Sequence, residues 1–335
     1  MEKSDRGKNN KDEKSLKNNS ASDDLARVRF VSIEEDEAGQ RIDNFLFRHL
    51  KGVPKSHIYR ILRSGEIRVN KGRVNQTCRL ETGDIVRIPP VRQAKSSEKH
   101  IPGARFETLF EDEHILIINK PAGIAVHGGS GISFGIIEQL RASRPELRYL
   151  ELVHRLDRET SGVLMLAKKR SALRRLHEQM RQGSIDKRYQ TLVTGNWTKA
   201  TSHVRLPLFK YVTPEGERRV RVQADGMASH TVFRKLEQYD DFTLLEAELK
   251  TGRTHQIRVH LAANGHVIAG DDKYGNFELN RELQKSGKDR GVLKRMFLHA
   301  HSICFTHPHT DEKVTITAPL PKDCADYLES LAKKS

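Results

Sequence analysis

Residues 152–168 read LVHRLDRETSGVLMLAK, in which two apolar segments flank a polar loop of nine residues, 154–162. Short apolar runs separated by a polar loop that ends in glycine predict two strands joined at that loop. Asp157 lies in the loop beside His154, Arg155 and Arg158. A carboxylate among cations stays ionised and becomes a reactive nucleophile when partly desolvated. The alternative is a carboxylate that pairs with arginine and pins the loop, and composition alone favours neither.

Strand-like segments dominate the sequence on both sides of this loop. The apolar patterns predict strands at Ile115–Ile118, Leu152–Val153, Val163–Ala167, Tyr189–Val193, Thr231–Lys235, Thr243–Leu249, Ser302–Phe305 and Val314–Ile316. Helices are predicted over residues 133–142, 171–182, 254–264 and 321–333. Because most strands follow one another directly, the pattern favours an α+β domain with a mixed, largely antiparallel sheet over a doubly wound sheet.

The segment 41–95 has a different character, with thirteen Lys and Arg residues against four acidic ones, an excess of +9. Apolar spacing predicts one helix from Ile42 and a second that opens near Pro54 and stops at Gly65. Two short strands around an Asn70-Lys71-Gly72 turn and a last strand at residues 85–88 complete the pattern. We therefore expect a small compact module with one basic face.

The composition sets the broad class of protein. The 335 residues carry 59 Lys and Arg against 44 Asp and Glu, a formal charge of +15, which favours a polyanionic partner over a merely solvated basic surface. The charged start lacks the apolar segment of a secretory signal, and no apolar run is long enough for a membrane helix. Three widely spaced cysteines favour a reducing cytosol, and so a cytoplasmic location. The predicted organisation is a disordered tail 1–24, the module at 25–91, a linker 92–104 and a larger domain 105–335.

Other catalytic and metal-binding patterns fail on inspection. Ser161 is not part of a Gly-x-Ser-x-Gly elbow, and the glycine-rich segment 128–131 lacks the Gly-Lys-Ser/Thr ending of a phosphate-binding loop. Cys304, His307 and His309 lie close in sequence but have no second ligand pair at zinc spacing. From these patterns we expect no metal site.

Two segments resemble known families. Arg41-Ile-Asp43, Lys55-Ser56, Gly65–Asn70 and Gly83-Asp84 resemble the S4 RNA-binding domain. His154-Arg-Leu-Asp157-x-x-Thr160-Ser-Gly162 resembles the signature of the RluA-type pseudouridine synthases. The same resemblance extends over residues 105–320 through Lys187-Arg188-Tyr189, Thr251–His260 and Asn119–Gly123. Within the family, the chain resembles synthases of the RluC type at Glu37–Leu46, His127–Gly131, Lys168–Leu173 and Phe297–Ala300.

The resemblance implies a role for each motif residue. Asp157 would be the nucleophile, attacking the uracil ring or the ribose C1′, and Arg258 would pair with it. Tyr189 would stack on the flipped base and offer its hydroxyl for proton transfer, with Ile257 on the other side of the base. Arg155 would fill the gap left by the flipped nucleotide. His154 and Thr160 are the remaining predicted substrate-binding residues.

The resemblance also implies a partner, 23S ribosomal RNA, whose uridines would be isomerised without a cofactor after base flipping. The S4-like module would add grip on the RNA through Arg41, Lys55, Arg60, Arg63, Arg68, Lys71 and Arg73. The chain is expected to act as a monomer, with no obligatory protein partner. Two alternatives remain: the same chemistry on other 23S positions or on tRNA, and a catalytically silent RNA-binding factor for ribosome assembly.

Overall fold

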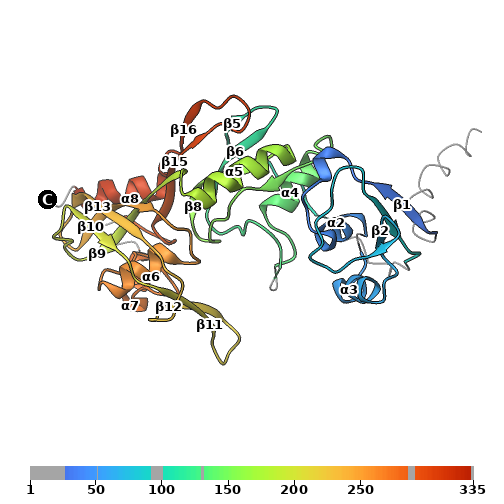
Figure 1. The fold of residues 1–335 in the computed structure, drawn as a ribbon. Helices are drawn as coiled ribbons and strands as arrows, with labels where there is room; N and C mark the ends of the chain where they lie inside the picture. Colours follow the sequence, from blue (N-terminus) through green and yellow to red (C-terminus); the bar gives the residue numbers. More distant parts are fainter. Residues whose placement is uncertain (1–26, 51, 92–100, 130–131, 286–290, 333–335) are drawn as a thin grey trace, which may run out of the picture. The chain divides into compact units, whose positions relative to one another are not determined.

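The computed structural model describes residues 27–50, 52–91, 101–129, 132–285 and 291–332. The chain divides into two compact units, residues 1–100 and 101–335 (Figure 1). The predicted tail 1–24, and the predicted linker as far as His100, lie outside the described residues. Ile101–Ala104 belong to the second unit, where the Ser143 hydroxyl donates a hydrogen bond of 3.0 Å to the Ala104 carbonyl. Within the described ranges, no helix is long and apolar enough to cross a membrane.

The first unit packs two helices on one face of a four-stranded antiparallel sheet of order β1-β4-β2-β3. Its elements are β1 (Arg29–Ser32), the 3-10 turn η2 (Glu35–Glu37), α2 (Ile42–His49), α3 (Lys55–Arg63), β2 (Arg68–Val69), β3 (Gly72–Arg73) and β4 (Ile85–Ile88). Phe45 of α2 and Ile58 of α3 are fully buried against Val86 and Ile88 of β4. Both predicted helices are therefore confirmed.

The loop of the hairpin between β2 and β3 is one residue shorter than the predicted turn Asn70-Lys71-Gly72. Its loop is Asn70-Lys71, with φ of 51° and 68°, and Gly72 is already paired with Val69 in the ladder. Two central residues with positive φ form the tight turn that matches the twist of a hairpin, and asparagine tolerates this backbone. The Asn70 side chain holds the turn by accepting a hydrogen bond from the Ile85 N–H at 2.9 Å and donating to Asp84 at 2.8 Å.

The second unit is built on a ten-stranded sheet in which eight strands follow the order β10-β13-β14-β9-β15-β8-β6-β5, with β16 beside β15 and β7 beside β8. The strands of this sheet are β5 (Thr108–Glu111), β6 (Ile115–Lys120), β7 (Glu151–Leu152), β8 (Ser161–Ala167), β9 (Asp186–Thr194), β10 (Thr201–Val204), β13 (Thr231–Gln238), β14 (Phe242–Leu249), β15 (Leu298–Thr306) and β16 (Lys313–Thr317). All its strand pairs are antiparallel except the parallel pair β15 and β8. The predicted mixed, largely antiparallel sheet is confirmed.

Helices cover both faces of this sheet: α4 (Ile136–Ser143), α5 (Arg170–Gln182), α6 (Gln256–Ala263), α7 (Phe277–Leu283) and α8 (Lys322–Ala332). On β8, Val163 packs in the cluster of α5, and Leu164 packs in the cluster of α4. A strand that is buried on both faces needs apolar side chains at successive positions. This requirement explains the uninterrupted run 163–167 that the sequence shows.

A two-stranded hairpin, β11 (Leu208–Val212) and β12 (Arg218–Val222), lies outside the main sheet and projects beside α6 (Figure 1). Leu208 and Val220 on one of its faces pack against Val259 of α6. The pattern rules missed this hairpin because its second strand, RRVRV, is dominated by arginine. The pattern rules also started α4 too early, at residue 133. Gly135 is the residue before the helix, and the Glu138 side chain accepts a hydrogen bond of 2.7 Å from the Gly135 N–H.

Candidate active site

The loop that carries Asp157 connects β7 to β8 and is fixed at several points. The Lys120 ammonium and the Gly123 N–H donate hydrogen bonds of 3.0 and 2.9 Å to the Arg158 carbonyl, and the Thr160 N–H donates to the Asp157 carbonyl at 3.1 Å. Lys120 is fully buried, and burial lowers the pKa of its ammonium to about 7. The loop is thus clamped on one side by the end of β6, which makes the position of the Asp157 carboxylate well defined.

Gly162, at the end of the loop, permits a close approach of two strands. Its φ is 107°, and a Cβ there would lie 2.2 Å from the Ala300 carbonyl oxygen of β15. Only glycine accepts both the backbone conformation and the contact. This contact lies at the short parallel pairing of Ser161 and Gly162 with His299 and Ala300, which joins β8 to the centre of the sheet.

A pocket of about 380 Å³ opens beside Asp157. All seven residues predicted from the second unit for catalysis and substrate binding line it, namely His154, Arg155, Asp157, Thr160, Tyr189, Ile257 and Arg258. They come from the β7–β8 loop, from β9 and from α6, so segments a hundred residues apart converge on one space. The predicted site is therefore a single cavity in the structure.

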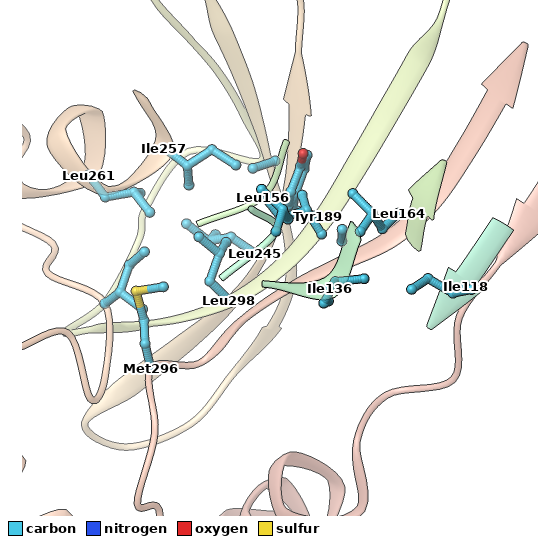
Figure 2. Close-up of a cluster of buried hydrophobic side chains, with 14 of the residues drawn as sticks. Ile118, Ile136, Leu156, Leu164, Tyr189, Leu245, Ile257, Leu261, Met296 and Leu298 are labelled. Carbon is cyan, nitrogen blue, oxygen red and sulfur yellow. The ribbon is translucent and has the colours of Figure 1, made fainter. Parts of the chain in front are cut away.

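The floor of the pocket is apolar. Tyr189 and Ile257 are 7% and 4% exposed and belong to one buried cluster with Leu156, Leu245 and Leu298, in which Figure 2 shows Tyr189 close to Leu156. Burial, together with the charge of Asp157, raises the pKa of the Tyr189 hydroxyl well above its usual range. Tyr189 therefore stays protonated at neutral pH and offers a hydrogen-bond donor rather than a phenolate.

Two of the basic residues beside Asp157 in the sequence have other partners. Arg158 pairs with Glu159 at 2.7 Å, and His154 uses its Nε2 to accept the Met165 N–H at 3.1 Å. Burial lowers the pKa of His154 to about 4, so it is a neutral residue that braces the loop. Two groups from the other half of the domain face the Asp157 carboxylate: Arg258, as the resemblance implies, and His255.

Arg258 contacts Asp157 more weakly than it contacts a second carboxylate. Its Nη1 lies 3.4 Å from Asp157 Oδ2, whereas its Nε and Nη2 donate hydrogen bonds of 2.8 and 2.7 Å to Asp271. Burial alone would raise the pKa of Asp271, but hydrogen bonds from Arg258 and from the N–H groups of Lys273 and Tyr274 outweigh it and lower that pKa. The expected pairing of Arg258 with Asp157 is present, and a second carboxylate supports it: Asp271 anchors the guanidinium in a bidentate geometry, and one amino group remains for Asp157.

His255 lies just before α6 rather than inside the predicted helix 254–264, and its side chain still faces Asp157 together with that of Arg258. It precedes α6 in a left-handed conformation, with φ of 54°, and its Nε2 lies 3.8 Å from Asp157 Oδ2. Its Nδ1 is 2.8 Å from the Tyr274 hydroxyl, and the Tyr274 ring lies 5.0 Å below the Arg258 guanidinium. Burial lowers the pKa of His255 to about 4, so it is neutral beside the carboxylate.

Comparison with known proteins decides the family. The RNA pseudouridylate synthase profile matches residues 114–263, and the S4 domain profile matches residues 40–86. The ribosomal large subunit pseudouridine synthase C of Salmonella typhi is 53% identical over 315 residues, covering 92% of this chain and 98% of that protein. The chain belongs to the RNA pseudouridylate synthase family.

Other relatives agree with this assignment. The synthase C of Escherichia coli (strain K12) is 53% identical over 311 residues, covering 91% of this chain and 97% of that protein. The solved structure of human RNA pseudouridylate synthase domain containing 4 superimposes with a TM-score of 0.55 at 26% identity, over 68% of this chain and 93% of that chain. The family and the S4 resemblance are both confirmed, and with them the catalytic fold.

Sequence patterns did not reveal three residues that this synthase uses to build its pocket: Lys120, Asp271 and Tyr274. Asp271 and Tyr274 lie in the segment Gly270-Asp-Asp-Lys-Tyr-Gly275, where two glycines bracket an acid and a tyrosine. Gly270 has φ of 77°, and a Cβ there would lie 2.1 Å from the Arg295 carbonyl oxygen. This close-set pair of glycines was the available signal that the segment is a tightly packed turn.

The seven basic residues predicted for the S4 unit of the synthase come from two parts of it. Arg41, Lys55, Arg60 and Arg63 lie in or beside the two helices, whereas Arg68, Lys71 and Arg73 lie on the sheet hairpin. Arg41 is already paired with Asp43, through hydrogen bonds of 3.1 and 2.6 Å. The Arg73 side chain reaches the end of α3, since a Cβ on Gly65 would lie 2.7 Å from its Nε. The single basic face and its contacts with RNA stay predictions.

Proposed function

We propose that this pseudouridine synthase isomerises specific uridines of 23S ribosomal RNA, without a cofactor, with Asp157 as the nucleophile. The observation that carries the proposal is the clamped Asp157 carboxylate, 20% exposed, at the edge of a pocket floored by Tyr189 and Ile257. The choice of RNA rests on relatives that are 53% identical over nearly the whole chain and are named for the large ribosomal subunit.

The reaction needs only the residues of the pocket. Asp157 attacks the target nucleotide, and the bond between N1 of uracil and C1′ of ribose breaks. The ring then rotates and C5 bonds to C1′, while the bond that Asp157 formed with the nucleotide breaks and frees the carboxylate. The proton on C5 leaves, and N1 gains a proton. Atoms and electrons balance, so the product is an isomer. Arg258 lies 3.4 Å from the Asp157 carboxylate and balances its negative charge, and Asp157 is partly withdrawn from water, which favours a nucleophile.

Flipping the nucleotide explains the shape of the site. A carboxylate cannot reach the glycosidic bond of a stacked, paired uridine, so the base has to leave the helix at a cost of a few kcal/mol. Tyr189 and Ile257 offer the flat, apolar surfaces that a flipped base needs, and the Tyr189 hydroxyl can donate to it. Arg155 is exposed at the rim, where it can occupy the gap left in the RNA.

A second hollow, of about 500 Å³, lies against Asp157 and is lined by both signs of charge. Arg158 and Lys273 are paired there with Glu159 and Glu217, which leaves Arg155 and Arg218 as candidates for contact with phosphate. Phosphate contacts of this kind supply the affinity that offsets the cost of flipping. The ribosomal substrate supports a cytoplasmic location.

The test is to map pseudouridines in 23S rRNA by carbodiimide labelling in a strain that lacks the gene. Complementation with the natural chain should restore the missing sites, and Asp157→Asn should not. The purified Asp157→Asn variant should still bind the RNA. The matched control is Glu159→Gln in the same loop, which loses only the pair with Arg158 and should remain active. Unchanged 23S rRNA in the deletion strain would refute the substrate, and product formed by Asp157→Asn would refute the nucleophile.

A further inference from the structure

We propose that the outer face of the S4 sheet binds unpaired RNA, with a base stacked on Phe30 and phosphates held by Arg68 and Arg87. The inference rests on the proposed function for the identity of the partner. It goes further by assigning the sheet face, rather than the helical face, to single-stranded nucleotides. This outer sheet face consists of Phe30, Arg68, Lys71, Ile85 and Arg87. These residues line a hollow of about 1020 Å³, together with Ser64, Gly65, Glu66 and Asn70.

The strand register places the key side chains of this face on one side of the sheet. Phe30 of β1 is paired with Arg87 of β4, and Arg87 is paired with Arg68 of β2. The alternate residues of the same strands, such as Val69 and Val86, are buried in the core beneath the helices. Since successive side chains of a strand point to opposite faces, Phe30, Arg68 and Arg87 all point away from that core.

Two apolar side chains on this face are unusually exposed to solvent. Phe30 is 67% exposed and Ile85 is 49% exposed, although both belong to the sheet. One exposed apolar residue is ordinary, but an exposed aromatic ring beside a second apolar side chain and a hollow indicates a binding surface.

The positive charge around Phe30 is available to a ligand. Arg68 and Arg87 each donate one hydrogen bond to a backbone carbonyl, that of Lys71 at 3.1 Å and that of Glu66 at 2.7 Å. Within the part of the chain that the structure describes, neither guanidinium has a carboxylate within 4 Å. The carbonyls therefore hold the side chains in place without neutralising them. Three basic side chains and one acid, Glu66, line the hollow.

An aromatic ring among fixed guanidinium groups matches the chemistry of an unpaired nucleotide. Every base has a flat face that stacks on phenylalanine, and arginine binds the phosphate that follows. The bases of a duplex are already stacked on one another, so paired RNA does not use the ring. The face is therefore expected to prefer single strands.

The experiment measures binding of the full-length chain to a fluorescent oligouridine and to an RNA hairpin of equal length. Phe30→Ala should weaken binding of the oligouridine by about tenfold and leave the hairpin almost unaffected. Phe30→Trp should restore binding. The matched control is Phe277→Ala, because Phe277 is similarly exposed, at 58%, but lies in the other unit. Equal affinity of Phe30→Ala and the natural chain for the oligouridine would overturn the proposal.

Charge provides a second readout. Arg68→Gln and Arg87→Gln should each reduce the slope of log Kd against log salt by about 0.7 for the single strand. Arg181→Gln is the control, since Arg181 is paired with Glu178 on α5. If Phe30→Ala changes sedimentation of the protein but not RNA affinity, the face joins two copies of the chain and the proposal is wrong. Should the natural chain form no pseudouridine, the proposed function fails; failure of the Phe30 test in an active enzyme refutes only this inference.

Discussion

Replacing Asp271 with asparagine should destabilise the catalytic unit more than any neighbouring substitution of an acid. The Asp271 and Arg258 side chains are 1% and 8% exposed and share two hydrogen bonds of 2.7 and 2.8 Å. Asparagine keeps the shape but removes the negative charge, and its amide N–H₂ would face the guanidinium N–H groups. Removing one partner of a buried ion pair costs about 3–5 kcal/mol, because the other charge is left uncompensated.

The loss should be visible at neutral pH. The pKa of Asp271 lies below its ordinary value, so its contribution to stability is present above about pH 4 and lost as the pH falls through the folded-state value. In a unit of this size, 3–5 kcal/mol lowers the Tm by roughly 10 °C. Calorimetry at pH 7 on the full chain should show this shift in the transition of the catalytic unit, with that of the S4 unit unchanged.

The adjacent Asp272 provides the control, because it is exposed and Asp272→Asn should leave the Tm within about 1 °C of that of the natural chain. The Asp271 variant should also react more slowly in single turnover, since the unanchored Arg258 can shift towards Asp157, now 3.4 Å away. A Tm for Asp271→Asn equal to that of Asp272→Asn would refute the reasoning, since Arg258 would then need no buried counter-ion.

Three further outcomes follow from burial and backbone geometry. Three histidines have a pKa lowered by burial to about 4: His154, His255 and His299. Between about pH 4 and 6.5 the folded chain therefore binds fewer protons than the unfolded chain. Urea unfolding should show that the free energy of unfolding falls with acidification, by up to about 4 kcal/mol per pH unit. A constant free energy of unfolding from pH 7 to 5 would contradict this. Gly162→Ala should fail to yield folded protein because of the 2.2 Å contact with Ala300, whereas Gly183→Ala, which meets no atom within 4 Å, should cost only about 1 kcal/mol of unfolding free energy. Arg155→Ala should lower kcat/KM roughly tenfold or more at unchanged Tm if its side chain fills the flipped-out gap, and unchanged kinetics would remove that role.

The sequence predicted those elements in which the order of apolar residues along the chain matches the buried faces. The run 163–167 indicated a strand, and β8 is indeed buried on both faces, with Val163 facing α5 and Leu164 facing α4. The motif residues were also placed in one pocket, because the resemblance carried information about the tertiary fold that spacing lacks. In contrast, the hairpin of β11 and β12 escaped prediction, since β12 is dominated by arginine and the hairpin packs against a single helix.

The partners of the nucleophile could not be predicted from local sequence. Asp271 lies thirteen residues from Arg258, and only the turn between Gly270 and Gly275 brings the two together. The predicted helix 254–264 includes His255, but its left-handed backbone places it just before the helix. Such contacts depend on the packing of α6 against the sheet, which no periodicity within one segment reveals.

The position of β15 has a consequence for the synthesis of the enzyme. The strand that follows the Asp157 loop and the strand that supplies Tyr189 are not neighbours, because β15 lies between β8 and β9. The ribosome makes β15 (Leu298–Thr306) after both of these strands. The two halves of the catalytic sheet therefore cannot close around the pocket until β15 has been added between them.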